Sequence, residues 1–189
     1  MSDELTGLVL EEATDKMAKT VSHTRQEFAG VRTGRASPAL VEKISVEYYG
    51  ATVPMQQLAG FAVPEARQLL ITPFDKGAMD AIERAIRESD LGLNPSNDGN
   101  SIRLSFPPLT EERRRDLVKV VKNMAEEGRI ALRNERRRAR HELEGMKKDG
   151  DISDDDLQRS EKELDKVIHA HEALIETALQ AKEAELLEG

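Results

Sequence analysis

Arginine and lysine recur along residues 113–148 at a spacing that places them on one face of a helix. This stretch holds 13 Lys and Arg against 6 Asp and Glu. At 3.6 residues per turn, several cations lie within about 40° of Arg129: Lys122, Arg133, Arg136, Arg140 and Lys147. Arg137 lies about 80° from Arg129. A guanidinium forms bidentate, charge-assisted hydrogen bonds with phosphate oxygens, so this face is predicted to bind RNA or another polyanion.

The rest of the same stretch refines this interpretation. Its apolar residues fall on another side of the helix: Leu117, Val121, Leu132, Ala139 and Met146. It has no aromatic residue, whereas binders of single strands stack bases on aromatics. Structured RNA, recognised through its backbone and shape, is therefore favoured. The alternative is a solvated face that only keeps the protein soluble. The RNA interpretation requires the guanidinium groups to share one face and to be free of neighbouring carboxylates.

The last segment has the opposite charge. Residues 149–189 hold 4 Lys and Arg against 13 Asp and Glu, within a chain whose net charge is −8. Such an asymmetry is more informative than the total. The acidic segment could oppose indiscriminate adhesion to RNA, although solubility is a simpler explanation.

Other chemistry finds little support. The chain has no Cys, which excludes disulfides, thiolate nucleophiles and Cys-based zinc sites. Its four His form no H-E-x-x-H pattern, and residues 30–37 lack the spacing of a phosphate-binding loop. We therefore expect no catalytic residue, no metal site, no cofactor and no enzymatic activity. The acidic start and the absence of a long apolar run predict a cytoplasmic protein with no membrane association.

Three long amphipathic helices are predicted, at residues 3–30, 110–148 and from 153 onward. Between them, strands are expected at 44–49, 53–58, 68–74 and 101–106, with a helix at 76–89. Pro54 and Pro64 suggest strand edges or turns. The predicted fold is α+β, mainly α: a long antiparallel three-helix bundle (1–30 and 105–189) with an inserted small β/α/β domain (31–104). Two adjacent chain crossings would form a hinge between them. His171, in an apolar stripe, is expected at the edge of the core.

Several segments together resemble the ribosome recycling factor family. They are Val31-Arg-Thr-Gly-Arg-Ala-Ser-Pro38, Val46-Glu-Tyr-Tyr-Gly50, Ser89-Asp-Leu-Gly-Leu-Asn-Pro95, Pro107-Pro-Leu-Thr-Glu-Glu-Arg-Arg114, Arg133-Asn-Glu-Arg-Arg137 and Lys182-Glu-Ala-Glu-Leu186. Each is short, but their order covers essentially the whole chain.

The resemblance implies an L-shaped monomer of tRNA dimensions whose bundle lies on large-subunit rRNA after peptide release. Elongation factor G, using GTP, would then drive separation of the ribosomal subunits. The family's rRNA-contacting arginines match Arg129, Arg133, Arg136 and Arg137, and the helical spacing adds Arg140 and Lys122. Glu135 should point toward the bundle. Arg32 and Arg35 match the family's inter-domain loop. Gly34 would give this hinge its turn freedom, and Pro38, Pro107 and Pro108 would limit its swing.

Two alternatives belong to other classes of function. One is a ribosome or structured-RNA binder that acts without GTP or elongation factor G. The other is a coiled-coil adaptor or homodimer that uses exposed apolar stripes to bind proteins.

Overall fold

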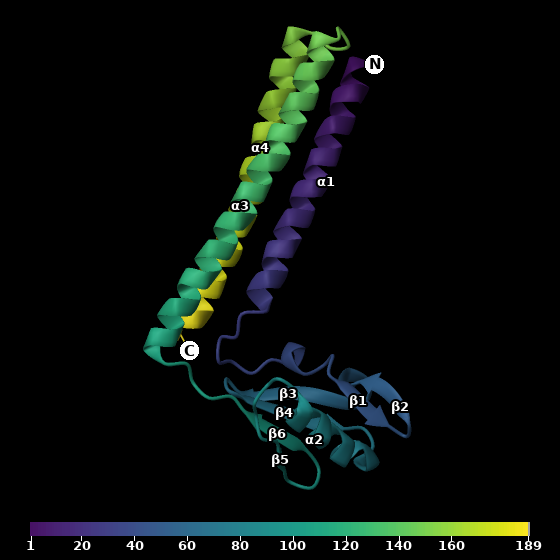
Figure 1. Cartoon of the computed structure of the whole chain (residues 1–189), viewed down its shortest axis with the longest axis vertical. Helices are drawn as coiled ribbons and strands as arrows, with labels where there is room; N and C mark the ends of the chain where they lie inside the picture. Colours follow the sequence, from purple (N-terminus) through teal and green to yellow (C-terminus); the bar gives the residue numbers. More distant parts are fainter. Residues whose placement is uncertain (189) are drawn as a thin grey trace. The chain divides into compact units, whose positions relative to one another are not determined.

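Three long helices lie side by side in the computed structural model, which describes residues 1–188 (Figure 1). They are α1 (Ser2–Ala29), α3 (Glu111–Lys148) and α4 (Asp154–Glu188). Each packs against the other two, and a tight turn at Gly150 makes α3 and α4 antiparallel. They form one compact unit, Met1–Arg32 with Glu111–Glu188, and residues Thr33–Thr110 form a second. The predicted bundle and inserted α+β segment are both present.

The bundle core follows the apolar periodicity of the three helices. Met17 and Val21 of α1, Leu132 and Leu143 of α3, and Ile175 of α4 are all essentially inaccessible to solvent. Burying such a stripe is the main source of stability for amphipathic helices of this kind. The packed stripes therefore fix which side of α3 remains outside.

The second unit contains a four-stranded antiparallel sheet with a helix and a separate hairpin. The sheet order is β3 (Ala59–Glu65), β4 (Gln68–Pro73), β6 (Ile102–Ser105) and β5 (Ser96–Asn97). The hairpin consists of the antiparallel strands β1 (Ser45–Tyr48) and β2 (Ala51–Pro54), and the helix, α2, spans Met79–Glu88. Apolar side chains of these elements and of Met55, which follows β2, form one core: Val46, Met55, Leu69, Ile71, Ile82, Ile86, Ile102 and Leu104.

The strand predicted at residues 53–58 is wrong beyond Pro54. Strand β2 ends at Pro54, and Met55–Gln57 forms a 3₁₀ turn, in which Leu58 N–H donates to the Met55 carbonyl. Proline has no N–H to continue a ladder, and the buried Met55 anchors the turn in the core. Strand β3 was not predicted, because its sequence is poor in β-branched residues. Pro64 lies on this edge strand, beside a register shift between Ala62 and Glu65, so its edge position is confirmed.

Two segments connect the units: the first, residues 30–37, follows α1, and the second, residues 106–110, precedes α3. Both are attached to the turn between β3 and β4. Ala36 N–H donates to the Ala66 carbonyl and Phe106 N–H donates to the Arg67 carbonyl, each at 2.8 Å. Between these segments the backbone approaches closely at Gly34, whose φ is +78°. A side chain there would lie 3.4 Å from the Leu109 side chain. The segments thus run side by side within the second unit.

Candidate nucleic-acid interface

The basic face of α3 lies along α4, and a row of ion pairs joins the two helices. Within residues 1–188 we count five such pairs, which we call the ion-pair ladder. In order along the antiparallel helices they are Lys122–Glu183 (3.8 Å), Arg129–Glu176 (2.6 Å), Arg136–Asp165 (2.7 Å), Arg140–Glu161 (3.3 Å) and Lys147–Asp154 (2.5 Å). The Asp154 carboxylate raises the pKa of Lys147 by accepting its hydrogen bond and by charge attraction.

Carboxylates of α3 itself add further contacts. Glu126 reaches both Arg129, at 3.4 Å, and Arg133, at 3.3 Å. Glu144 lies 3.1 Å from Arg140 Nε. Five of the six residues predicted to bind RNA therefore contact a carboxylate.

The two requirements of the RNA interpretation have different outcomes. Five of the six cations share one face, as predicted, but these five are not free of carboxylates. A helical projection of α3 alone cannot show which side chains a second helix brings beside it. The signal was nevertheless present in the acidic segment, because Asp154 and Glu161, like Glu176 and Glu183, are seven residues apart and so repeat on one face.

Pairing with carboxylates leaves most of these cations accessible. The Arg133 and Arg140 side chains are each 52% exposed and Arg136 is 41% exposed, whereas Arg129 is 23% exposed. Exposed ion pairs contribute little free energy, because water screens the charges and two long side chains must be ordered. A guanidinium also has five N–H donors, more than one carboxylate engages. The ladder arginines can therefore still donate to phosphate.

Arg137 differs from the other predicted residues. It is exposed and has no carboxylate contact within residues 1–188. It lines a shallow hollow on the solvent side of α3, together with Asn134, Arg138 and His141. A phosphate in this hollow would meet donors from all four side chains.

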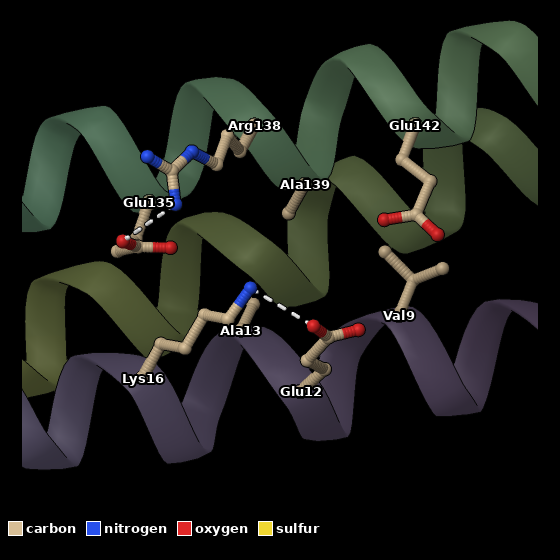
Figure 2. A pocket seen from close by; sticks show the side chains of 8 residues that line it. All are labelled: Val9, Glu12, Ala13, Lys16, Glu135, Arg138, Ala139 and Glu142. Atoms are coloured by element: carbon tan, nitrogen blue, oxygen red, sulfur yellow. Dashed lines mark hydrogen bonds and ion pairs between the residues drawn. The ribbon is translucent and has the colours of Figure 1, made fainter.

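Beside this hollow, α3 faces α1 across a narrow groove of about 130 Å³, and Arg138 lines both. Figure 2 shows Lys16 beside Glu12 on α1 and Arg138 beside Glu135 on α3. The two ion pairs measure 2.9 Å and 3.4 Å. The Lys16 hydrogen bond lowers the pKa of Glu12. Glu135 is 19% exposed and points toward α1, as predicted. The groove is lined by three carboxylates, the third being Glu142, and by two cations. This excess of negative charge disfavours a phosphate.

The predicted hinge residues all lie in or beside the two connecting segments. Arg32 and Arg35 are exposed, and Arg35 N–H donates to Thr33 Oγ1 at 3.4 Å. Pro38 begins a 3₁₀ turn capped by Ser37, and Pro107 and Pro108 follow β6. Buried Thr33, which the sequence did not single out, thus orders the first segment.

Two further features of the described chain bear on other chemistry. His171 is half-buried on α4, with Nδ1 2.7 Å from the Val167 carbonyl, a contact within its own helix. In residues 1–188 no group of three or more His, Cys, Asp or Glu side chains could hold a metal ion. No helix in that range is long and apolar enough to cross a bilayer.

Comparisons with known proteins agree with one another. The family model described as ribosome recycling factor matches residues 24–187. The ribosome-recycling factor of Acidothermus cellulolyticus is 54% identical, covering 94% of this chain and 96% of that protein. The one from Cutibacterium acnes is 53% identical, covering 95% and 98%.

Two solved structures are similar over nearly the whole chain. A solution structure of ribosome recycling factor has a TM-score of 0.79 and 43% identity, covering 97% of this chain and 98% of that one. The Thermus thermophilus factor, placed with Escherichia coli elongation factor G on the E. coli post-termination complex, has a TM-score of 0.66 and 44% identity. It covers 96% of this chain and 98% of its own.

Proposed function

The chain belongs to the ribosome recycling factor family, a family of translation factors and not of enzymes, and we propose that it recycles ribosomes after termination. It binds the post-termination ribosome and, with elongation factor G and GTP, promotes dissociation into subunits. The observation that carries this proposal is the similarity, across 96% of the chain, to a factor placed with elongation factor G on that complex. The proposed setting is the cytoplasm, where ribosomes terminate.

The basic face of α3 is the proposed contact with large-subunit rRNA. Arg129, Arg133 and Arg136 supply guanidinium groups along several turns. The other proposed contacts on this helix are Lys122, Arg137 and Arg140. Phosphates repeat along an RNA backbone, so a row of cations can engage several at once. The lack of aromatics on α3 supports recognition of shape and backbone instead of bases.

The connecting segments are the proposed hinge. Arg32, Gly34 and Arg35 lie in or beside the first segment, and Pro107 and Pro108 lie in the second. Prolines restrict the backbone, while Gly34 allows the positive φ that the close approach requires. Because each segment is hydrogen-bonded to the β3–β4 turn, bending would be confined to the few residues between that anchor and the helices.

The competing functions have less support. A coiled-coil adaptor needs an exposed apolar stripe, yet the periodic apolar residues of α1, α3 and α4 are buried in the bundle. The exposed apolar side chains of the bundle, such as Leu8, Ile130 and Leu174, are scattered over three helices.

Subunit splitting tests the proposal directly. Post-termination complexes are mixed with this protein, purified elongation factor G and GTP, and light scattering follows the loss of intact ribosomes. Splitting is expected with all three components and not when any one is omitted. Splitting without GTP or elongation factor G would support the GTP-independent alternative, and no splitting under any condition would refute the proposed function.

A further inference from the structure

The carboxylates of α4 that face the ladder arginines have an effect of their own on RNA binding. We propose that Glu176 and Asp165 determine specificity: they hold Arg129 and Arg136 in fixed positions and weaken their attraction for RNA in general. Binding then favours folded RNA whose phosphates are already arranged to match. This inference rests on the proposed function, in which α3 contacts rRNA.

The geometry of both arginines supports a positioning role. Arg129 is held between two carboxylates, with Nη2 2.6 Å from Glu176 and Nη1 3.4 Å from Glu126. Arg136 approaches Asp165 Oδ1 through two nitrogens, Nε at 2.8 Å and Nη2 at 2.7 Å. Two contacts per guanidinium restrict the rotation of a long side chain. The N–H groups that remain are then presented from a defined position.

The same carboxylates reduce the attraction of α3 for any polyanion. A phosphate within reach of Arg129 also lies well within the Debye length, about 8 Å at physiological salt, of Glu176. It is therefore attracted by one charge and repelled by the other. This penalty applies equally to a generic RNA and to ribosomal RNA, because it depends only on charge and distance.

The benefit of a fixed guanidinium does not apply equally. Ordering a long side chain on binding costs free energy, and an arginine that is already held avoids that cost. The saving is realised only when the phosphate stands where the held guanidinium can reach it. A generic RNA is repelled by the carboxylates and gains nothing from the held arginines. A rigid RNA surface with complementary phosphates is repelled equally, but it binds without the free-energy cost of ordering those side chains. The net result is selectivity without any reading of bases.

A charge-neutralising double variant, Glu176→Gln with Asp165→Asn, tests the inference. The Kd is measured for purified large ribosomal subunits and for a mixed-sequence RNA duplex at one moderate salt concentration. The duplex should bind about fivefold more tightly, since two weak ion pairs are removed. Affinity for the large subunit should stay within about twofold, because the lost positioning offsets the relieved repulsion. The preference for the large subunit therefore falls.

A matched control is available on the same helix. Glu163 and Glu185 each form an ion pair with a lysine three residues away, Lys166 and Lys182, outside the ladder. Their exposures, 53% and 46%, resemble those of Glu176 and Asp165, 49% and 45%. The double change Glu163→Gln with Glu185→Gln alters net charge identically and should leave the preference unchanged.

A third variant separates the two effects. Glu176→Asp retains the charge but shortens the side chain, so the contact with Arg129 is lost. It should weaken binding to the large subunit without tightening binding to the duplex. The inference is overturned if the neutralised variant keeps the original preference, or if the control loses as much. Splitting by the unaltered protein is measured in parallel, so that a failure of the proposed function is recognised separately.

Discussion

Thr24 of α1 occupies the position where a side chain at Gly128 of α3 would begin. A methyl group on Gly128 would lie 2.6 Å from Thr24 Oγ1 and 3.1 Å from Ile175 Cδ1. All three helices of the bundle therefore meet at this point, and only glycine allows them to approach so closely. Gly128→Ala should lower the free energy of unfolding by about 1–3 kcal/mol, the usual cost of overpacking a core. Urea denaturation followed by circular dichroism measures it.

The same helix supplies the control for this prediction. A side chain at Gly145 would contact nothing within 4 Å, so Gly145→Ala should raise the free energy of unfolding by roughly 0.5–1 kcal/mol through helix propensity. Combining Gly128→Ala with Thr24→Ala should recover part of the loss. Equal losses for Gly128→Ala with and without the Thr24 change would show that the clash is not the cause.

The start of α4 is stabilised by a reciprocal cap. Asp156 N–H donates to Ser153 Oγ at 3.1 Å, and Ser153 N–H donates to Asp156 Oδ2 at 3.2 Å. Ser153→Ala removes the acceptor and should lower the free energy of unfolding by about 1 kcal/mol, measured by urea denaturation. Ser22→Ala is the control, because Ser22 is exposed on α1, and it should change stability by less.

This cap also predicts a pH dependence. The Ser153 backbone N–H, followed by its hydroxyl, lowers the pKa of Asp156 from 3.8. A depressed pKa in the folded state contributes stability above the unfolded value, and this is lost as pH falls through the folded value. The stability difference between the protein and Asp156→Asn should therefore be present at neutral pH and shrink below about pH 4. If this stability difference did not change with pH, the Asp156 carboxylate would not be the group that stabilises the cap.

Tyr48 in the second unit should titrate unusually late. Its hydroxyl donates to Asp75 Oδ2 at 2.5 Å, and this hydrogen bond raises the pKa of Tyr48 to about 12. The raised value stabilises the fold below pH 10.0, and the contribution is lost as pH rises toward 12. In a Tyr49→Phe background Tyr48 is the single tyrosine, and phenolate absorbance reports its titration. Adding Asp75→Asn should bring the titration midpoint down toward 10.0.

Much of the fold could be predicted from the sequence, because the bundle obeys a simple periodicity. Met17, Val21 and Phe28 repeat at helical spacing and are buried in the structure. The second unit was harder, because its strands are short and their pairing depends on contacts distant in sequence. Strand β3 was missed since its residues have low strand propensity and its position is set by pairing with β4.

In the candidate site, too, the features set by one helix could be predicted, and those set by contacts between helices could not. The shared face of Arg129, Arg136 and Arg140 follows from the spacing within one helix. The partners Glu176, Asp165 and Glu161 depend on how α4 is aligned against α3, which a single helix does not reveal. Predicting the ladder would have required comparing the seven-residue repeats of both helices.

Binding of Arg133→Ala with Arg136→Ala to purified large subunits, across a salt series, tests the central claim most directly. Each lost phosphate contact should lower affinity about tenfold and reduce the slope of log affinity against log salt by about one. The free energy of unfolding should change by less than about 1 kcal/mol for each ion pair removed. Arg25→Ala with Lys162→Ala removes the same charge from exposed positions of α1 and α4, and should change affinity far less. An unchanged affinity and salt slope for the α3 variant, or an equal loss in the control, would contradict the assignment of this face to rRNA.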